Sequence, residues 1–278
     1  MRNNSDRLSQ NTQEPQTVAS PGQSFPSNTT YVALPSGGRY YSEKNPLFGK
    51  DSLEFKDLTT KEEDILTNQS YIKNGVVFDK LLSSILIDKI DSSDLLPGDR
   101  DAVLIAARLN GYGHEHNVQV ACPKCNSPQQ HTIDISQFKN SDGTQNLAKW
   151  DVQTTEQNTF VVTLKQSDVE VEFKLLTVKD LNELEKSQTL REQRELPSNQ
   201  RTEQMCKMIV SVNGDSDRQK VIQSVANFKP YDSRFLNRIH QEISPSVDRT
   251  VSFECKKADC QHIWTAEVPV TANFFWFV

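Results

Sequence analysis

Four of the five cysteines in this 278-residue chain occur in two close pairs that could bind a metal ion. Cys122 and Cys125 form a Cys-x2-Cys pair in ACPKCNSP, and Cys255 and Cys260 form a Cys-x4-Cys pair in FECKKADCQH. Structural zinc takes four soft ligands in a tetrahedron, and a short spacing lets one turn direct two thiolates at one ion. The sequence therefore predicts that the two pairs, although far apart in the chain, bind one structural Zn²⁺ ion.

Other interpretations of these residues stay open at this point. The pairs could be separate, buried, reduced thiols, whereas disulfides fit a reducing compartment less well. His131 and His262 follow the cysteines and could replace a ligand, but four thiolates already satisfy the ion, so we expect ordinary strand residues there. Cys206 in MCKMIV is expected in the core. His114 and His116 in GYGHEHN fit a solvated loop better than a second metal site.

Alternating apolar and polar residues flank both cysteine pairs. The runs VQVAC and HTIDI enclose the first pair, and TVSFEC and HIWTAEV enclose the second. Such alternation is typical of β-strands, so each pair would lie at the turn of a hairpin. Two hairpins that share an ion form a zinc ribbon, and the sequence predicts a split one, with knuckles at residues 118–135 and 251–268.

Helical periodicity dominates the rest of the chain, which predicts an α+β fold with a mostly helical body and short β-hairpins. Thr60 and Glu63 are spaced as the capping box of a helix that runs to Asn74-Gly75. Pro97 opens another helix, which Gly111 is expected to end. Further helices are predicted at residues 76–90, 177–195, 199–212, 215–228 and 229–243, and a further hairpin at residues 160–176.

A faint internal repeat links the two halves of the chain. FKDLTTKEEDIL at residues 55–66 resembles FKLLTVKDLNEL at residues 173–184, with a separation of 118 residues. PGDRDAVL and PYDSRFLN start two helices 133 residues apart, and the same separation relates Cys122 to Cys255. Chance together with common helix-start chemistry is the alternative. We favour a degenerate duplication in which each half supplies capped helices and then a cysteine knuckle.

Composition suggests three segments and limits the function classes. Residues 1–30 are rich in Asn, Gln, Ser, Thr and Pro, which predicts a disordered polar tail, followed by an extended arm at residues 31–55 and a folded body at residues 56–278. The net charge of −6 argues against a strongly basic nucleic-acid surface. No apolar run suggests a transmembrane span or a signal peptide, so we expect a soluble cytosolic protein.

No motif in the sequence predicts catalysis, and the conspicuous remaining features suggest contact surfaces. HExxH, P-loop, GxSxG and GxGxxG patterns are all absent. The arm is glycine-rich and aromatic, and the chain ends on NFFWFV, which would cover either its own core or a partner. The predicted partner-binding residues are Leu34, Pro35, Gly37, Gly38, Arg39, Tyr40, Tyr41, Phe274, Phe275, Trp276 and Phe277.

Several long motifs, in order, resemble a known family. LPSGGRYY, LTTKEEDILTNQSYIKNG, LLPGDRDAVLIAARLNGYG and ACPKC are similar to sequences of the baseplate hub assembly proteins of T4-like contractile-tailed phages, closely over residues 31–135. The second cysteine pair fits that pattern less tightly. The resemblance implies a non-enzymatic protein that helps to build the central hub of the tail baseplate with other hub proteins and the tape-measure protein. It would act in the host cytoplasm during tail assembly, or remain in the virion baseplate, without a small-molecule substrate.

The competing hypothesis is a zinc-ribbon protein that binds nucleic acid. It requires exposed basic and aromatic residues around the knuckles, as Lys124, Lys256, Lys257 and Trp264 could provide. Glu254, Asp259 and Glu267 nearly cancel that positive charge. We therefore expect no nucleic-acid partner.

Overall fold

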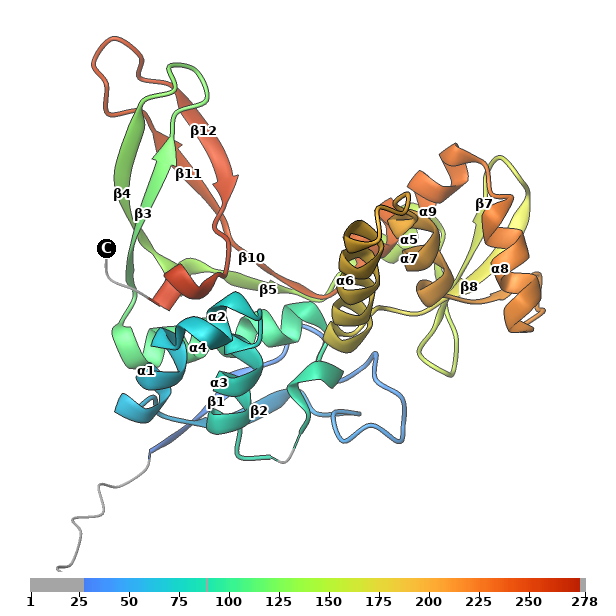
Figure 1. The fold of residues 1–278 in the computed structure, drawn as a ribbon, viewed down its shortest axis with the longest axis horizontal. Coiled ribbons are helices and arrows are strands. Elements are labelled where there is room, and N and C mark those ends of the chain that lie inside the picture. Colours follow the sequence, from blue (N-terminus) through green and yellow to red (C-terminus); the bar gives the residue numbers. More distant parts are fainter. Residues whose placement is uncertain (1–27, 89, 276–278) are drawn as a thin grey trace, which may run out of the picture.

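The fold is a mixture of helices and small antiparallel sheets in three parts. The computed structural model describes residues 28–88 and 90–275. Figure 1 shows a first lobe built from the N-terminal half, a second lobe that contains α6 to α9, and a projection of two β-hairpins that stands away from the lobes. The predicted polar tail lies outside the described residues except at its end, where Thr29 and Thr30 already belong to the first strand.

The first lobe packs four helices on a two-stranded sheet. Strand β1 (Thr29–Ala33) pairs antiparallel with β2 (Ser52–Lys56), which is followed by α1 (Thr60–Thr67), α2 (Gln69–Lys73), α3 (Val77–Ile85) and α4 (Pro97–Tyr112). The capping box lies one residue earlier than predicted, with Thr59 as N-cap and Glu62 as its partner. The predicted single helix breaks at Asn68, because the Asn68 side chain caps the amides that start α2. Helix α4 ends at Gly113, which has a φ of 80°, and not at Gly111.

The second lobe contains a four-stranded sheet in the order β6-β7-β8-β9. Its strands are β6 (Gln153–Thr154), β7 (Phe160–Leu164), β8 (Val169–Phe173) and β9 (Ile209–Val212), and its helices are α5 (Gln145–Trp150), α6 (Val178–Gln193), α7 (Gln200–Met208), α8 (Arg218–Ala226) and α9 (Pro230–Ile243). The predicted hairpin at residues 160–176 is confirmed. The helix predicted through residue 212 is wrong at its end, because residues 209–212 add to the sheet beside β8.

Two short strands that the sequence did not reveal join the lobes. Strand β5 (Lys139–Ser141) pairs antiparallel with β10 (Ser246–Asp248), and short 3-10 turns at Ser92–Asp94, Ile135–Gln137 and Ala272–Phe275 complete the connections. The crossing is tight: a Cβ on Gly98 would lie 2.1 Å from the carbonyl oxygen of Pro245. A glycine at the first turn of α4 is therefore required by the approach of the other half of the chain.

The predicted extended arm is instead a compact run of turns at residues 35–49, part of which packs against both lobes. Leu34 and Tyr41 are buried, and the Tyr41 hydroxyl donates a 2.5 Å hydrogen bond to the carboxylate of Asp99 in α4. The Tyr40 ring packs on Phe160 of the second lobe with a centroid distance of 5.4 Å. Because Tyr41 contacts the first lobe and Tyr40 contacts the second, this segment connects the two lobes. Its apolar and aromatic side chains are stabilised by burial in the chain's own core.

The two halves share a detailed hydrogen-bond pattern. Each proline-initiated helix carries a fully buried aspartate in its first turn, Asp99 in α4 and Asp232 in α9. One carboxylate oxygen of Asp99 accepts the Ser36 amide at 2.9 Å, and one of Asp232 accepts the Gln166 amide at 2.9 Å. The second oxygen accepts a serine hydroxyl in both cases. The capping box of α6, Thr177 with Asp180, likewise matches that of α1.

The aromatic end of the chain belongs to the core as far as the structure describes it. Phe274 and Phe275 lie in the final 3-10 turn and are buried. The Phe275 ring lies 6.0 Å from Phe78, and the Phe274 carbonyl accepts a 3.1 Å hydrogen bond from the guanidinium of buried Arg108. The prediction of partner contacts is wrong for these two phenylalanines. Trp276 and Phe277 lie outside the described residues.

Candidate metal centre

The two cysteine pairs lie at the tips of the two projecting hairpins. Strand β3 (Glu115–Ala121) pairs with β4 (Pro128–Asp134), and β11 (Thr250–Glu254) pairs with β12 (Ile263–Glu267), so both predicted knuckle hairpins are confirmed. In the first turn the Asn126 amide donates to the Cys122 carbonyl at 2.8 Å, and in the second the Cys260 amide donates to the Lys257 carbonyl at 2.9 Å. Both turns use a residue of positive φ, Asn126 and Gln261. These turns direct the cysteine side chains of each pair toward the facing hairpin.

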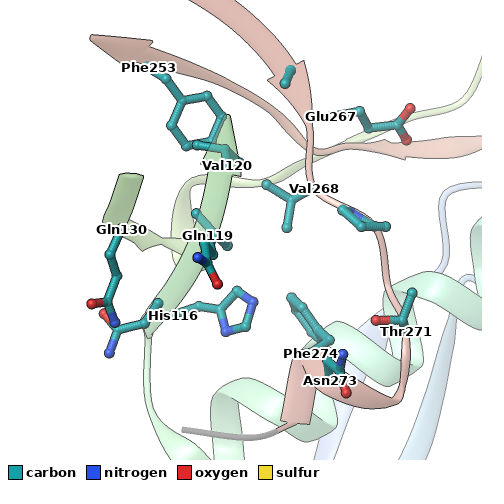
Figure 2. A pocket seen from close by; sticks show the side chains of 14 residues that line it. His116, Gln119, Val120, Gln130, Phe253, Glu267, Val268, Thr271, Asn273 and Phe274 are labelled. Atoms are coloured by element: carbon teal, nitrogen blue, oxygen red, sulfur yellow. The ribbon is translucent and has the colours of Figure 1, made fainter. Parts of the chain in front are cut away.

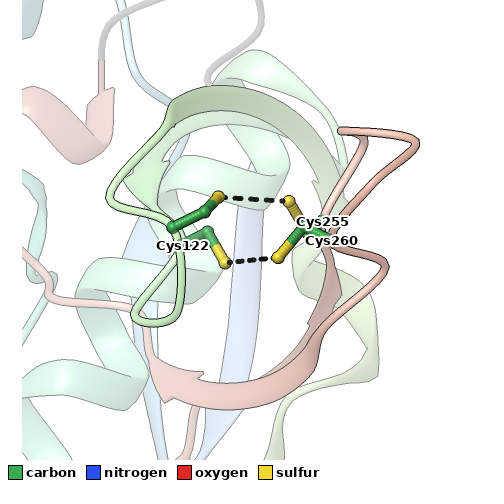
Figure 3. Close-up of side chains that lie close together, drawn as sticks. Cys122, Cys255 and Cys260 are labelled. Carbon is green, nitrogen blue, oxygen red and sulfur yellow. Dashed lines mark hydrogen bonds between the residues drawn. The ribbon is translucent and has the colours of Figure 1, made fainter.

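The four sulfurs form one compact cluster (Figure 3). All four Sγ atoms lie within 4.8 Å of one another. Across the hairpins, Cys122 and Cys260 are 3.9 Å apart and Cys125 and Cys255 are 3.7 Å apart. A tetrahedron with Zn–S bonds of about 2.3 Å has S···S edges of about 3.8 Å, whereas a disulfide is about 2.05 Å long. The four thiols are free, and their spacing fits a single tetrahedral metal ion.

A glutamine supports the cluster from the second strand of the first hairpin. The Gln129 side-chain amide donates a 2.8 Å hydrogen bond to the Cys255 sulfur, and its carbonyl oxygen accepts the Lys256 amide at 2.8 Å. Gln129 is buried, so these two bonds fix one hairpin tip against the other. Hydrogen bonds of this kind orient metal ligands and tune their basicity.

The thiols differ in their readiness to ionise. Loss of solvation opposes ionisation of Cys255, but hydrogen bonds from the Lys257 amide and from Gln129 lower its pKa to about 7. Loss of solvation and the neighbouring thiols raise the pKa of Cys260 to about 11. Four thiolates at this spacing repel one another strongly, so a bound divalent cation would be needed to hold all of them deprotonated.

The histidines of the hairpins pack beside the cluster and do not join it. The His131 ring lies 5.3 Å from Phe253 and 6.2 Å from Trp264, and His262 stacks on Trp264 at 6.2 Å. Among the described residues, the four cysteines are the one group of three or more metal-ligating side chains close enough to share an ion. Cys206, by contrast, is buried in α7, as predicted.

A cavity of about 450 Å³ lies at the base of the projection (Figure 2). The interpretation of His116 as a loop residue is wrong: it lies in β3, is buried, and meets the Phe274 ring at 5.0 Å. Burial lowers the His116 pKa, which favours the neutral imidazole. The one carboxylate that lines the cavity, Glu267, is bound by Arg249, so the lining offers no pair of carboxylates for acid and base catalysis.

Arg249 holds the second hairpin to the first lobe. Its guanidinium contacts the carboxylates of Asp101 in α4 and Glu267 in β12. The Arg249 side chain is largely buried. Its planar guanidinium contacts two carboxylates, which fixes the orientation of the second hairpin relative to α4. The sequence does not point to Arg249, because Asp101 lies far away in the chain and Glu267 lies on another strand.

The predicted contact residues of the arm are mostly engaged within the chain. Leu34, Pro35, Gly38 and Tyr41 are buried and Gly37 is half-buried, so the prediction of a free docking surface is wrong for the buried four. Arg39 is exposed, and its guanidinium forms a 2.7 Å ion pair with Asp142. Within the described part of the chain, the helices are too short or too polar to cross a membrane.

Comparison with known proteins identifies the family. The family model described as T4 bacteriophage base plate protein matches residues 27–276, which is most of the chain. No curated protein and no solved structure gave a significant match. The match includes both lobes and both cysteine hairpins, and the chain therefore belongs to the T4 bacteriophage base plate protein family.

Proposed function

We propose that this chain is a non-enzymatic structural component or assembly factor of the central hub of a phage tail baseplate, and that its four clustered cysteines bind a structural zinc ion. The observation that carries the baseplate role is the family match over residues 27–276. The hub location, the other hub proteins and the tape-measure protein as partners, and action in the host cytoplasm before incorporation into the tail are the finer parts of the proposal.

The cysteine geometry supports zinc in a closed, structural role. Four thiolates complete a tetrahedral shell, which leaves no position for the water or substrate that a catalytic zinc needs. The sulfurs come from hairpins about 130 residues apart in the chain, so the ion would tie the two halves together as a split zinc ribbon. The shared pattern around Asp99 and Asp232 supports the further proposal that the halves arose by duplication.

The zinc proposal is tested by metal content. Protein purified without chelators should contain about one zinc per chain by atomic emission, and Cys125→Ser should lose it. Ser141→Ala, away from the cluster in β5, is the matched control and should keep its zinc. Absence of zinc from the unsubstituted protein would refute the proposal of a zinc ribbon.

The hub proposal is tested by its partners. Tagged full-length chain recovered from infected cells should carry baseplate hub proteins or the tape-measure protein, identified by mass spectrometry. Trp276 and Phe277 stay proposed contact residues, so Trp276→Ala should reduce that recovery without loss of zinc. Recovery of tail proteins that all lie outside the hub would overturn the hub assignment while leaving the baseplate family intact.

The nucleic-acid alternative is less well supported by the side chains near the cysteines. The ammonium group of Lys256 contacts the Gln130 carbonyl, and Trp264 packs against Phe253 at 5.7 Å. Two of the residues that could contact a phosphate or a base are thus engaged within the projection. A gel shift at low salt that weakens steeply as salt is added would favour the alternative.

A further inference from the structure

The cavity at the base of the projection has an unpaired polar atom in its wall. His116 of β3 lines the cavity and is only 6% exposed. Within the described part of the chain, its Nδ1 atom has no hydrogen-bond partner. Figure 2 shows the imidazole ring directed from β3 toward the space between Val268 and Phe274. Since an unpaired buried polar atom is costly, a ligand that bonds to Nδ1 would remove that cost.

Apolar side chains form much of the remaining wall. They come from β3, from the second hairpin and from the final turn, and they include Val118, Val120, Phe253, Ala266, Val268 and Phe274. The His116 and Phe274 rings meet edge to face, with centroids 5.0 Å apart. An apolar cavity of about 150 Å³ can hold benzene, so a cavity of about 450 Å³ has room for a larger aromatic group.

The charge of the lining favours an uncharged ligand. Of the described lining residues, only Glu267 carries a charge, and Arg249 binds its carboxylate. The wall therefore offers no free charge to hold an ionic metabolite. Gln119, Thr271 and Asn273 also line the cavity and are exposed, so it opens to solvent. An open apolar cavity with a buried hydrogen-bonding atom suits a neutral aromatic group that enters from outside.

The chemistry of Nδ1 favours a hydroxyl group as its partner. The lowered pKa of His116 keeps the imidazole neutral, so one ring nitrogen donates a hydrogen bond and the other accepts one. A phenol hydroxyl can both donate and accept, whereas an indole N–H can only donate. A tyrosine side chain can therefore bond to Nδ1 in either tautomer of His116.

We propose that this cavity receives a tyrosine side chain from another protein of the tail baseplate, with its ring among the apolar residues and its hydroxyl bonded to Nδ1 of His116. Aromatic side chains that fill a pocket are common anchors of protein interfaces, because they bury a large area and exclude water. The proposal rests on the baseplate role of this chain, which the family match supports. It depends neither on the zinc ion nor on the hub location.

The first test measures the binding of two neutral probes to the full-length chain by NMR. N-acetyl-tyrosinamide should shift the methyl signals of Val118 and Val268 and the Nδ1 signal of His116. It should bind about tenfold more tightly than N-acetyl-phenylalaninamide, because only the tyrosine probe supplies the hydrogen bond. A tenfold preference corresponds to about 1.4 kcal/mol, which lies in the range of one hydrogen bond.

Two matched substitutions assign the preference to His116. His116→Phe keeps an aromatic ring beside Phe274 but lacks Nδ1, and it should bind both probes equally. His131→Phe is the control: the Nε2 atom of His131 is also buried without a partner in the described chain, but His131 does not line this cavity. This control should keep the tenfold preference.

The second test identifies the source of the tyrosine. A photo-crosslinking amino acid in place of exposed Gln119, at the opening of the cavity, should capture a baseplate protein in infected cells through a peptide that contains tyrosine. A baseplate protein from outside the hub would support this proposal and contradict the hub location, so the two proposals can fail separately.

Four outcomes would overturn the proposal. In the probe experiment these are equal binding of the two probes to the unsubstituted chain, and a tyrosine preference that persists in His116→Phe. In the crosslinking experiment these are a captured peptide without tyrosine, and capture of a second copy of this chain in place of another baseplate protein.

Discussion

His240 makes the second lobe sensitive to acid. Its side chain is buried in α9, and its Nε2 accepts a 3.3 Å hydrogen bond from the Leu176 amide, which requires that nitrogen to be unprotonated. The ring lies 6.4 Å from that of Phe173. Burial lowers the His240 pKa from 6.5 to about 4, because a charged imidazolium would lose its hydration in this site.

The sign and size of the effect follow from the two pKa values. Below pH 6.5 the unfolded chain binds a proton at His240 that the folded chain refuses until about pH 4, so stability falls as pH drops through this window. Each unit of pKa difference corresponds to about 1.4 kcal/mol. Between pH 7 and pH 4.5 the loss from this one group should be about 2.5 kcal/mol in the free energy of unfolding.

Urea denaturation of wild type and His240→Gln at both pH values measures this term. Other acid-sensitive groups, including the thiolates, act in both proteins, so the difference between the two pH responses isolates His240. The pH response of the variant should be smaller by about 2.5 kcal/mol. His114→Gln is the control, since His114 is exposed, and it should respond as wild type does. An unchanged response in His240→Gln would refute the argument that burial suppresses protonation.

Three further substitutions test the packing between distant parts of the chain. Gly98→Ala, which would stabilise an ordinary helix by up to about 1 kcal/mol, should instead lower the melting temperature, since its Cβ would lie 2.1 Å from the Pro245 carbonyl oxygen. Asp99→Ala should cost about 3 to 5 kcal/mol in denaturant unfolding, because three buried donors from Ser36 and Tyr41 lose their acceptor; a cost under 1 kcal/mol would contradict this role. Arg249→Ala should cost about 1 to 2 kcal/mol and speed hydrogen exchange in β11 and β12 while zinc is retained; unaltered exchange there would show that the guanidinium does not hold the hairpin.

The local elements were predictable because their signals lie within short stretches of chain. Proline at the first turn of α4 and α9, and alternation in both cysteine hairpins, place these elements correctly. The start of α1 was predicted one residue too late, because two neighbouring threonines offer equally good capping boxes. Thr59 and Thr60 are each followed three residues later by a glutamate, and the structure uses Thr59 with Glu62 because Glu62 also accepts the Ser84 hydroxyl at 2.6 Å.

Short strands escaped prediction because their pairing partners are remote. β5 and β10 have three residues each and are more than one hundred residues apart, so neither carries a periodic signal of its own. The strand at residues 209–212 follows a helix without a break, and its residues continue the helical pattern. In each case the backbone bonds to a partner decide the conformation, and that partner cannot be read from neighbouring residues.

The residue types that can bind a metal, their spacing within each hairpin and the repeat of helix starts and cysteines can all be read from short stretches of the chain. The meeting of sulfurs at 3.7 to 3.9 Å across the hairpins, and the burial of Leu34, Tyr41 and Phe274 in the chain's own core, follow only from how distant segments pack. Apolar residues that end up exposed and apolar residues that end up buried look alike in a sequence. Burial depends on which distant segments fold against them, and here the other half of the chain covers residues that composition alone suggested for a partner.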